Sequence, residues 1–241
     1  FCLSRGLGDV YKRQALSFVI DTYDSDNLIA SKQKVTRENS EVHISNINRT
    51  EFREWLRFNE GSGNTAYDIS GYNNHGTLYG PSWVSGFQSY GLRFDGLNDY
   101  LKVEDSQSLH IDNAITVCYW CKFESPQYWS IIMMKGESYS MGDNDWFFFH
   151  GGENNIGFGI INEYGQEKSI FSSGVLEYGK WYFIIGKYNQ DKVWIRIMND
   201  TYDNWWWAWG GGKIRVSTSN IYMATRAFVA YTLVNLDEVQ I

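Results

Sequence analysis

The strongest indication of the fold is a series of short apolar or alternating runs that begins at Phe52. The runs include YGLRF, YLKV, ITVCYWCKF, WFFFH, IGFGII and VWIRIM, and turn-like segments such as FDGLND and GGENN separate them. Alternation with a period of two is typical of β-strands, and Gly, Asn and Asp clusters are typical of turns. No ten-residue amphipathic helical pattern lies between the runs, so the sequence favours antiparallel sheets over a parallel sheet with crossover helices.

About a dozen such strands in roughly 190 residues predict an all-β fold, a two-sheet antiparallel jelly-roll sandwich. The run AITVCYWCKF supports two layers, because alternate side chains of a strand point to opposite faces. Cys118, Trp120 and Lys122 share the mixed face, which we expect on the outer surface or in a groove. The other face is wholly apolar and is expected in the core: Ile115, Val117, Tyr119, Cys121 and Phe123.

Composition argues against a disordered, a nucleic-acid-binding and a membrane-spanning protein. Aromatic residues make up 17% of the 241 residues and there are only 2 prolines, which indicates a folded chain. The net charge is −7, which gives no electrostatic signature for binding nucleic acid or an anionic membrane. No apolar run approaches the ~18 residues of a membrane span. We therefore expect neither nucleic acid as a partner nor membrane insertion.

The first fifty residues differ in texture from the rest. Residues 4–14 read SRGLGDVYKRQ, which resembles the in-frame translation of a transposase adapter used to build sequencing libraries. We expect residues 1–14 to be an unstructured artefact, with the native start and any signal peptide lost. Residues 15–50 are interpreted as a linker or the end of an upstream β-module, and residues 51–241 as one domain.

Several motifs from Phe52 onward carry a family resemblance. LRFNEGSGNTAYDISGYNNHGTLYGPSW, GLRFDGLNDYLKV, EYGKWYFIIGKYNQDKVWIRIMND and LDEVQI occur in this order. Together they resemble the laminin-G-like jelly-roll domains of the concanavalin A-like lectin/glucanase superfamily, over about residues 52–241. The resemblance implies the sandwich fold and a role in carbohydrate recognition or hydrolysis.

The glucanases of this superfamily carry their catalytic carboxylates as Glu-x-Asp-x-x-Glu or Glu-x-Asp-x-Glu along one strand. This sequence has no such run; in LDEVQI, Asp237 and Glu238 are adjacent and are expected to point to opposite faces. Glycoside hydrolysis needs two carboxyl groups facing each other across the bond. We therefore predict that the domain is not an enzyme, and we keep a glucanase-like glycoside hydrolase as an alternative.

Calcium is the candidate cofactor. Asp143 and Asn144 stand before the run WFFF and resemble the Asp-Asn calcium pair of pentraxin lectins, although the second acidic cluster of that site is not matched. A calcium site that uses the DISGYNNHG loop or Asp237 is another possibility. The alternative is that these are turn residues only.

The segment TYDNWWWAWGGGK is the candidate ligand-binding motif. Trp205, Trp207 and Trp209 share one face of the expected strand, and Trp206 and Ala208 share the other. A sandwich strand has only one core face, so some of these indoles are expected to be exposed. We select Trp206, Trp207 and Trp209 as ligand-binding residues. The alternative is a hairpin covered by the chain's own linker.

Together these patterns predict a non-catalytic binding module for glycans or glycosylated surfaces, within a larger secreted or surface protein. A glycan or glycoprotein surface is the expected partner, together with upstream domains of the same chain. The expected location is extracellular, at a cell surface or at a virion surface. A structural or adhesion domain of a phage tail or fibre is the alternative from another class.

Overall fold

The computed structural model describes residues 52–241, except 88, 126–129, 137–143, 153, 175 and 225–232, together with four short strands before them. Those strands form two hairpins: β1 (Tyr23–Asp24) with β2 (Asn27–Leu28), and β3 (Thr36–Glu38) with β4 (Glu41–His43). The expectation of an adapter at residues 1–14 lies outside the described residues. The domain boundaries stay a prediction.

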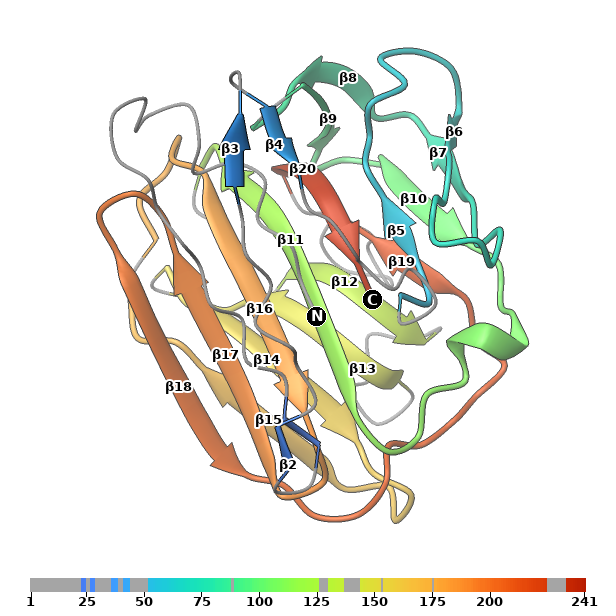
Figure 1. Cartoon of the computed structure of the whole chain (residues 1–241), viewed down its shortest axis with the longest axis vertical. Helices are drawn as coiled ribbons and strands as arrows, with labels where there is room; N and C mark the ends of the chain where they lie inside the picture. The colour runs from blue at the N-terminus through green and yellow to red at the C-terminus, as the bar shows by residue number, and fades with distance from the viewer. Residues whose placement is uncertain are drawn as a thin grey trace.

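Two large sheets make up the domain (Figure 1). The first sheet has the order β15-β14-β13-β12-β19-β10-β7-β6. Its strands are β6 (Thr65–Ala66), β7 (Gly76–Tyr79), β10 (Tyr100–Val103), β12 (Ser130–Gly136), β13 (Asn144–His150), β14 (Ile156–Ile161), β15 (Glu167–Phe171) and β19 (Ile221–Met223). The 3-10 helix η3 (Gln107–Leu109) follows β10.

The second sheet has the order β18-β17-β16-β11-β20-β9-β8, and β5 pairs with β20 beside this path. Its strands are β5 (Trp55–Leu56), β8 (Ser82–Ser85), β9 (Tyr90–Asp95), β11 (Ile115–Phe123), β16 (Tyr182–Tyr188), β17 (Lys192–Met198), β18 (Asp203–Trp209) and β20 (Leu233–Gln240). The strand β20, last in the sequence, lies in the middle of the sheet between β11 and β9.

Every pairing within the two sheets is antiparallel, which confirms the predicted all-β jelly-roll sandwich. Within the described residues, no helix is long and apolar enough to cross a membrane.

The core lies between the two sheets, and β11 shows how the sequence builds it. The five residues predicted for the core all join the main buried cluster: Ile115, Val117, Tyr119, Cys121 and Phe123. Cys118 and Trp120 alternate with them and lie on the outer face, meaning the face turned away from the other sheet. Phe87 stacks on Trp120 with ring centroids 3.8 Å apart, so this outer face is covered here rather than open.

The first sheet also has apolar residues on its outer face. Phe147 and Phe149 alternate with the core residues Trp146 and Phe148 along β13. They pack with Ile131, Met134 and Ile161 in a second buried cluster. The middle of this sheet is therefore apolar on both faces, as expected for a strand sequence without polar alternation.

Candidate ligand-binding surface

The strand β18 forms one edge of the second sheet and carries the tryptophan segment (left in Figure 1). Trp205, Trp207 and Trp209 have exposed fractions of 56%, 41% and 71%. Trp206 and Ala208 point the other way and pack against the core. The alternation along one strand therefore places three indoles in a row on the outer face of the sheet.

The neighbouring strand β17 adds a second row to this surface. Trp194 lies directly opposite Trp207, while Lys192 and Arg196 lie opposite Trp209 and Trp205. Residues that face each other across an antiparallel pair share one side of the sheet, so all three are on the outer face. The residues between them, including Val193, belong to the core. We call Trp194, Trp205, Trp207 and Trp209 the tryptophan surface.

Cations lie among these indoles. The Nζ of Lys192 is 4.4 Å from the ring centroid of Trp207 and 5.4 Å from that of Trp209. The rings of Trp207 and Trp209 meet edge to face, with centroids 5.4 Å apart. On β16, Lys187 lies opposite Trp194, and its Nζ is 5.6 Å from that ring centroid. These distances are within the range of cation–π attraction.

Arg196 has a different partner. Its Nε and a terminal nitrogen donate to the two carboxylate oxygens of Asp203, at 2.8 and 2.6 Å. The hydrogen bonds from Arg196 lower the pKa of Asp203 below its ordinary value. Arg196 is therefore held in a two-pronged ion pair at the end of the tryptophan surface.

The structure changes the predicted set of site residues. Trp207 and Trp209 lie on the exposed surface, but Trp206 packs against the core because its position in the strand alternates with theirs. Trp205 takes its place in the exposed row. Trp194 was missed, although the pattern of β17, with Val193, Ile195 and Ile197 as alternate apolar residues, indicates that it faces outward.

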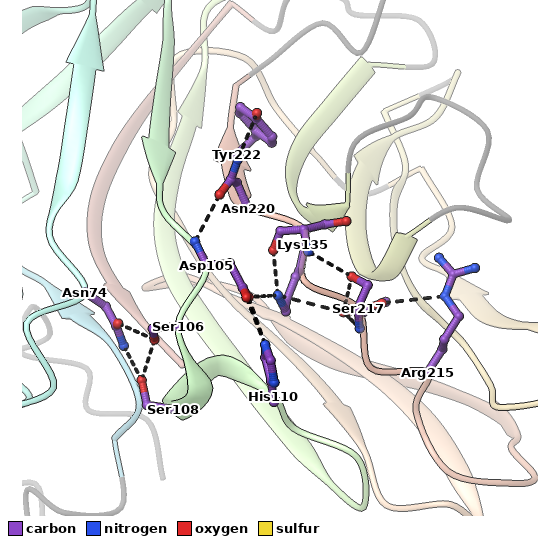
Figure 2. Close-up of polar contacts among 12 residues, drawn as sticks. Asn74, Asp105, Ser106, Ser108, His110, Lys135, Arg215, Ser217, Asn220 and Tyr222 are labelled. Atoms are coloured by element: carbon purple, nitrogen blue, oxygen red, sulfur yellow. Dashed lines mark hydrogen bonds and ion pairs between the residues drawn. The ribbon is translucent and has the colours of Figure 1, made fainter.

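A separate polar cluster lies at one end of the first sheet (Figure 2). Lys135, at the end of β12, is only 1% exposed, and its Nζ donates to Oδ1 of Asp105 at 2.7 Å and to the carbonyl oxygen of Ser219 at 2.6 Å. Its Nζ is 3.9 Å from Oδ2 of Asp145, the second residue of β13. Nε2 of His110 is 2.9 Å from Oδ2 of Asp105.

Other contacts complete this cluster. The backbone nitrogen and the hydroxyl of Ser217 both donate to Oδ2 of Asp145, at 3.0 and 2.9 Å. Burial acts to raise the pKa of Asp105, but the hydrogen bonds from Lys135 and His110 outweigh it, so the pKa is lowered. Burial raises the pKa of Asp145. Both carboxylates contact one buried ammonium group, so we interpret the cluster as an internal ion network that holds the loops together.

The predicted calcium residues are only partly within the described residues. Asp143 lies outside them. Asn144 is the first residue of β13 and is fully buried, so it belongs to a strand rather than to a preceding loop. Among the residues that the structure describes, no group of three or more His, Cys, Asp and Glu side chains is placed to hold a metal ion. The calcium site stays a prediction.

The DISGYNNHG loop is organised by its own aspartate. One carboxylate oxygen of Asp68 accepts hydrogen bonds from the backbone nitrogens of Trp55 and Ser70, at 2.8 and 2.9 Å. The other accepts from the hydroxyl of Ser70 and from the backbone nitrogen of Asn74, at 2.7 and 2.9 Å. Asn73 has a positive φ of 60°, which Asn tolerates in turns. Asp68 thus acts as the anchor of a tightly wound loop.

Comparison with known proteins agrees with this architecture. Residues 94–202 match the family model for the concanavalin A-like lectin/glucanases superfamily, Laminin_G_3, which confirms the resemblance seen in the sequence motifs. No curated protein sequence matches the chain.

Solved structures with a similar fold include two binding domains of botulinum neurotoxin. The serotype G binding domain has 15% sequence identity and a TM-score of 0.59, and the match covers 78% of this chain and 47% of that one. The serotype D ligand binding domain, solved in complex with N-acetylneuraminic acid, has 12% identity and a TM-score of 0.60, with coverages of 80% and 48%. This chain thus spans about half the length of the neurotoxin domains.

A third similar structure is domain 4 of an extracellular GH43 arabinanase from Geobacillus stearothermophilus, solved in complex with arabinotriose. It has 11% sequence identity and a TM-score of 0.57. The match covers 78% of this chain and 90% of that domain. At these identities the three structures share the fold with this chain.

Proposed function

We propose that this jelly-roll domain is a non-catalytic glycan-binding module whose contact site is the tryptophan surface. The observation that carries the proposal is the row of exposed indoles at Trp205, Trp207 and Trp209, on the outer face of an edge strand. The module is part of a larger secreted or surface-exposed protein.

Exposed indoles need an explanation because they leave apolar area in water. Each Å² of such area is unfavourable by about 25 cal/mol, and clusters of exposed apolar side chains usually mark a binding site. The C–H face of a sugar ring stacks on an indole, while its hydroxyl groups hydrogen-bond to polar neighbours. Arg196, exposed and opposite Trp205 on the same face of the sheet, is of the type that sugar hydroxyls contact.

The similar structures support this proposal. A neurotoxin ligand binding domain was solved with N-acetylneuraminic acid and an arabinanase domain with arabinotriose, so proteins with related folds have been solved with sugars bound. The fold alone does not define the ligand, because one fold hosts many functions. The aromatic surface of this chain is therefore the main support.

Binding is tested with Trp207→Ala and Trp209→Ala on a glycan array, followed by calorimetry with the best ligand. We expect each variant to lose at least about tenfold in affinity, because aromatic side chains at the centre of a contact contribute most of the binding energy. Tyr67→Ala is the matched control, since Tyr67 is also exposed, at 55%, but lies outside the second sheet.

Thermal unfolding of the same variants separates binding from folding. We expect their Tm to stay close to that of the wild type, because the two indoles are exposed. Normal folding with unchanged binding to every ligand would contradict the proposed site. Unfolding of both variants would show that these tryptophans stabilise the fold instead.

The absence of catalysis is tested by incubating the protein with polysaccharides and measuring new reducing ends. We expect none above background, because the sequence lacks the carboxylate run of glucanases and Asp105 and Asp145 share one buried ammonium group. Turnover that disappears in Asp105→Asn or Asp145→Asn would contradict this part of the proposal.

A further inference from the structure

We propose that the glycan bound at the tryptophan surface is acidic, and that Lys187 and Lys192 contact its carboxylate or sulfate groups. The inference rests on the proposed function, because it names the class of glycan that the same surface binds. The observation behind it is that two ammonium groups lie among the indoles and that no carboxylate of the described residues pairs with either of them.

The two lysines are placed by strand register. Lys187 lies opposite Trp194, and Trp194 lies opposite Trp207, so these three side chains form one line across β16, β17 and β18. Lys192 lies on β17 two residues before Trp194 and opposite Trp209. Its Nζ lies over the rings of Trp207 and Trp209. A ligand stacked on these indoles therefore lies beside both ammonium groups.

Counter-charges are scarce at this surface. In the described part of the chain, no carboxylate forms an ion pair with Lys187 or Lys192. Asp203 is engaged by Arg196, and Asp191 belongs to the turn that precedes β17. The whole chain has 21 Lys and Arg residues against 28 Asp and Glu residues. Two lysines that have no carboxylate partner among the described residues therefore give this aromatic surface a positive charge, opposite in sign to the net charge of the protein.

An acidic sugar suits this arrangement better than a neutral one. Attraction to the ring faces holds the ammonium groups close to the indoles, where the substituents of a stacked sugar lie. A neutral sugar offers only hydroxyl groups to the two ammonium groups. It also competes with Lys192 for the ring of Trp207. A carboxylate or sulfate accepts a shorter and stronger, charge-assisted hydrogen bond from the same lysine.

The experiment compares glycans that differ in charge. The probes are lactose and 3′-sialyllactose, galactan and polygalacturonate, and dextran and dextran sulfate, with the full chain as the binding protein. We expect the acidic member of at least one pair to bind about tenfold or more tightly than its neutral partner. This preference should shrink as the salt concentration rises from about 50 to about 500 mM, because salt screens exposed charges.

Variants assign the preference to the two lysines. Lys192→Gln and Lys187→Gln are each expected to weaken binding of the acidic glycan about three- to tenfold and not to weaken binding of the neutral glycan. Lys192→Gln should even strengthen neutral binding slightly, because it frees the ring of Trp207. Lys102→Gln is the control, because it removes the same charge from β10 in the first sheet. Trp207→Ala is expected to weaken both kinds of binding.

Several results would overturn the inference. Equal binding of neutral and acidic partners, lost in Trp207→Ala, would leave the proposed function intact and contradict the acidic ligand. Equal effects of Lys102→Gln and Lys192→Gln would show that net charge and not this surface sets the preference. Binding to vesicles that contain phosphatidylserine, with no binding to any glycan, would contradict both proposals.

Discussion

Glu54 is a carboxylic acid in the interior of the protein. Both of its carboxyl oxygens are buried, and neither has a hydrogen-bond partner within the described residues. Burial, together with repulsion from Asp68, raises the pKa of Glu54 well above its ordinary value. The folded protein therefore retains a proton that the unfolded chain releases near a pKa of about 4.3.

This difference predicts how stability depends on pH. Between the ordinary and the raised pKa, the folded state binds more protons than the unfolded state, so the contribution of Glu54 to the free energy of unfolding falls as pH rises. Glu54→Gln removes this titration. We expect the variant to be about as stable as the wild type near pH 4 and more stable at pH 8. Urea unfolding at several pH values measures this.

The control for that series is Glu104→Gln, which removes an exposed carboxylate. The Glu54→Gln curve should depart from that of the wild type by more than the Glu104→Gln curve does. If Glu54→Gln and the wild type have parallel stability curves between about pH 4 and about pH 8, the raised pKa of Glu54 is contradicted.

Lys135 is the buried cation of the internal ion network. Lys135→Met keeps the length of the side chain but leaves Asp105 and Asp145 without their shared ammonium group. We expect a loss of about 3–5 kcal/mol in the free energy of unfolding, because removing one partner of a buried ion pair destabilises the charge that remains. Without Lys135, the ion-pair partners that remain in the described part of the chain are His110 for Asp105 and Arg215, at 3.6 Å, for Asp145. Equilibrium urea unfolding at neutral pH gives the value.

Lys102→Met is the comparison for this prediction, because Lys102 forms an ion pair with the exposed Glu104. Such surface pairs contribute only about 0–1 kcal/mol. A loss in Lys135→Met no larger than that in Lys102→Met would contradict the role of the ion network.

At the scale of the strands, Gly186 in β16 shows how closely the two sheets pack. A Cβ atom at this position would lie 2.3 Å from Cζ of Phe148 and 2.6 Å from Cγ of Phe158, both in the first sheet. Both rings are fully buried in the core. The side chain of residue 186 is therefore limited to a hydrogen atom, and the aromatic rings of the facing sheet fill the space.

We expect Gly186→Ala to lower the free energy of unfolding by about 1–3 kcal/mol, as overpacking of a close-packed core does. Gly151→Ala is the matched control, since its nearest atom to an added Cβ is at 3.6 Å, an ordinary contact distance. Thermal or urea unfolding compares the two. An equal, small effect of both substitutions would contradict the close approach of the sheets at Gly186.

At the scale of the whole molecule, residues 51–241 should form one independent domain. The two sheets share a single main core, and β5, the first strand after residue 51, pairs with β20, the last strand in the sequence. We expect a protein limited to residues 51–241 to keep a β-sheet far-UV spectrum, one cooperative unfolding transition and the same glycan binding. A mostly unfolded spectrum would contradict the predicted boundary.

The alternating pattern of the sequence predicted the class of fold and the two faces of its strands. In β11 the alternation predicted the five core residues, and in β18 it predicted that Trp205, Trp207 and Trp209 share a face. These predictions succeed because the direction of a strand side chain depends on local backbone geometry, which repeats every two residues. The resemblance to lectin-like domains likewise depended on ordered local motifs.

Which face of β18 meets the core depends on how the two sheets pack, and this packing puts Trp205 rather than Trp206 in the exposed row. It also placed Trp194 and the two lysines beside these indoles, through the register of three strands. Asp105, Lys135 and Ser219 meet in one ion network although 30 and 84 residues separate the lysine from its partners. Such contacts depend on strand order and register, which no local pattern contains, because many pairings are compatible with the same alternation.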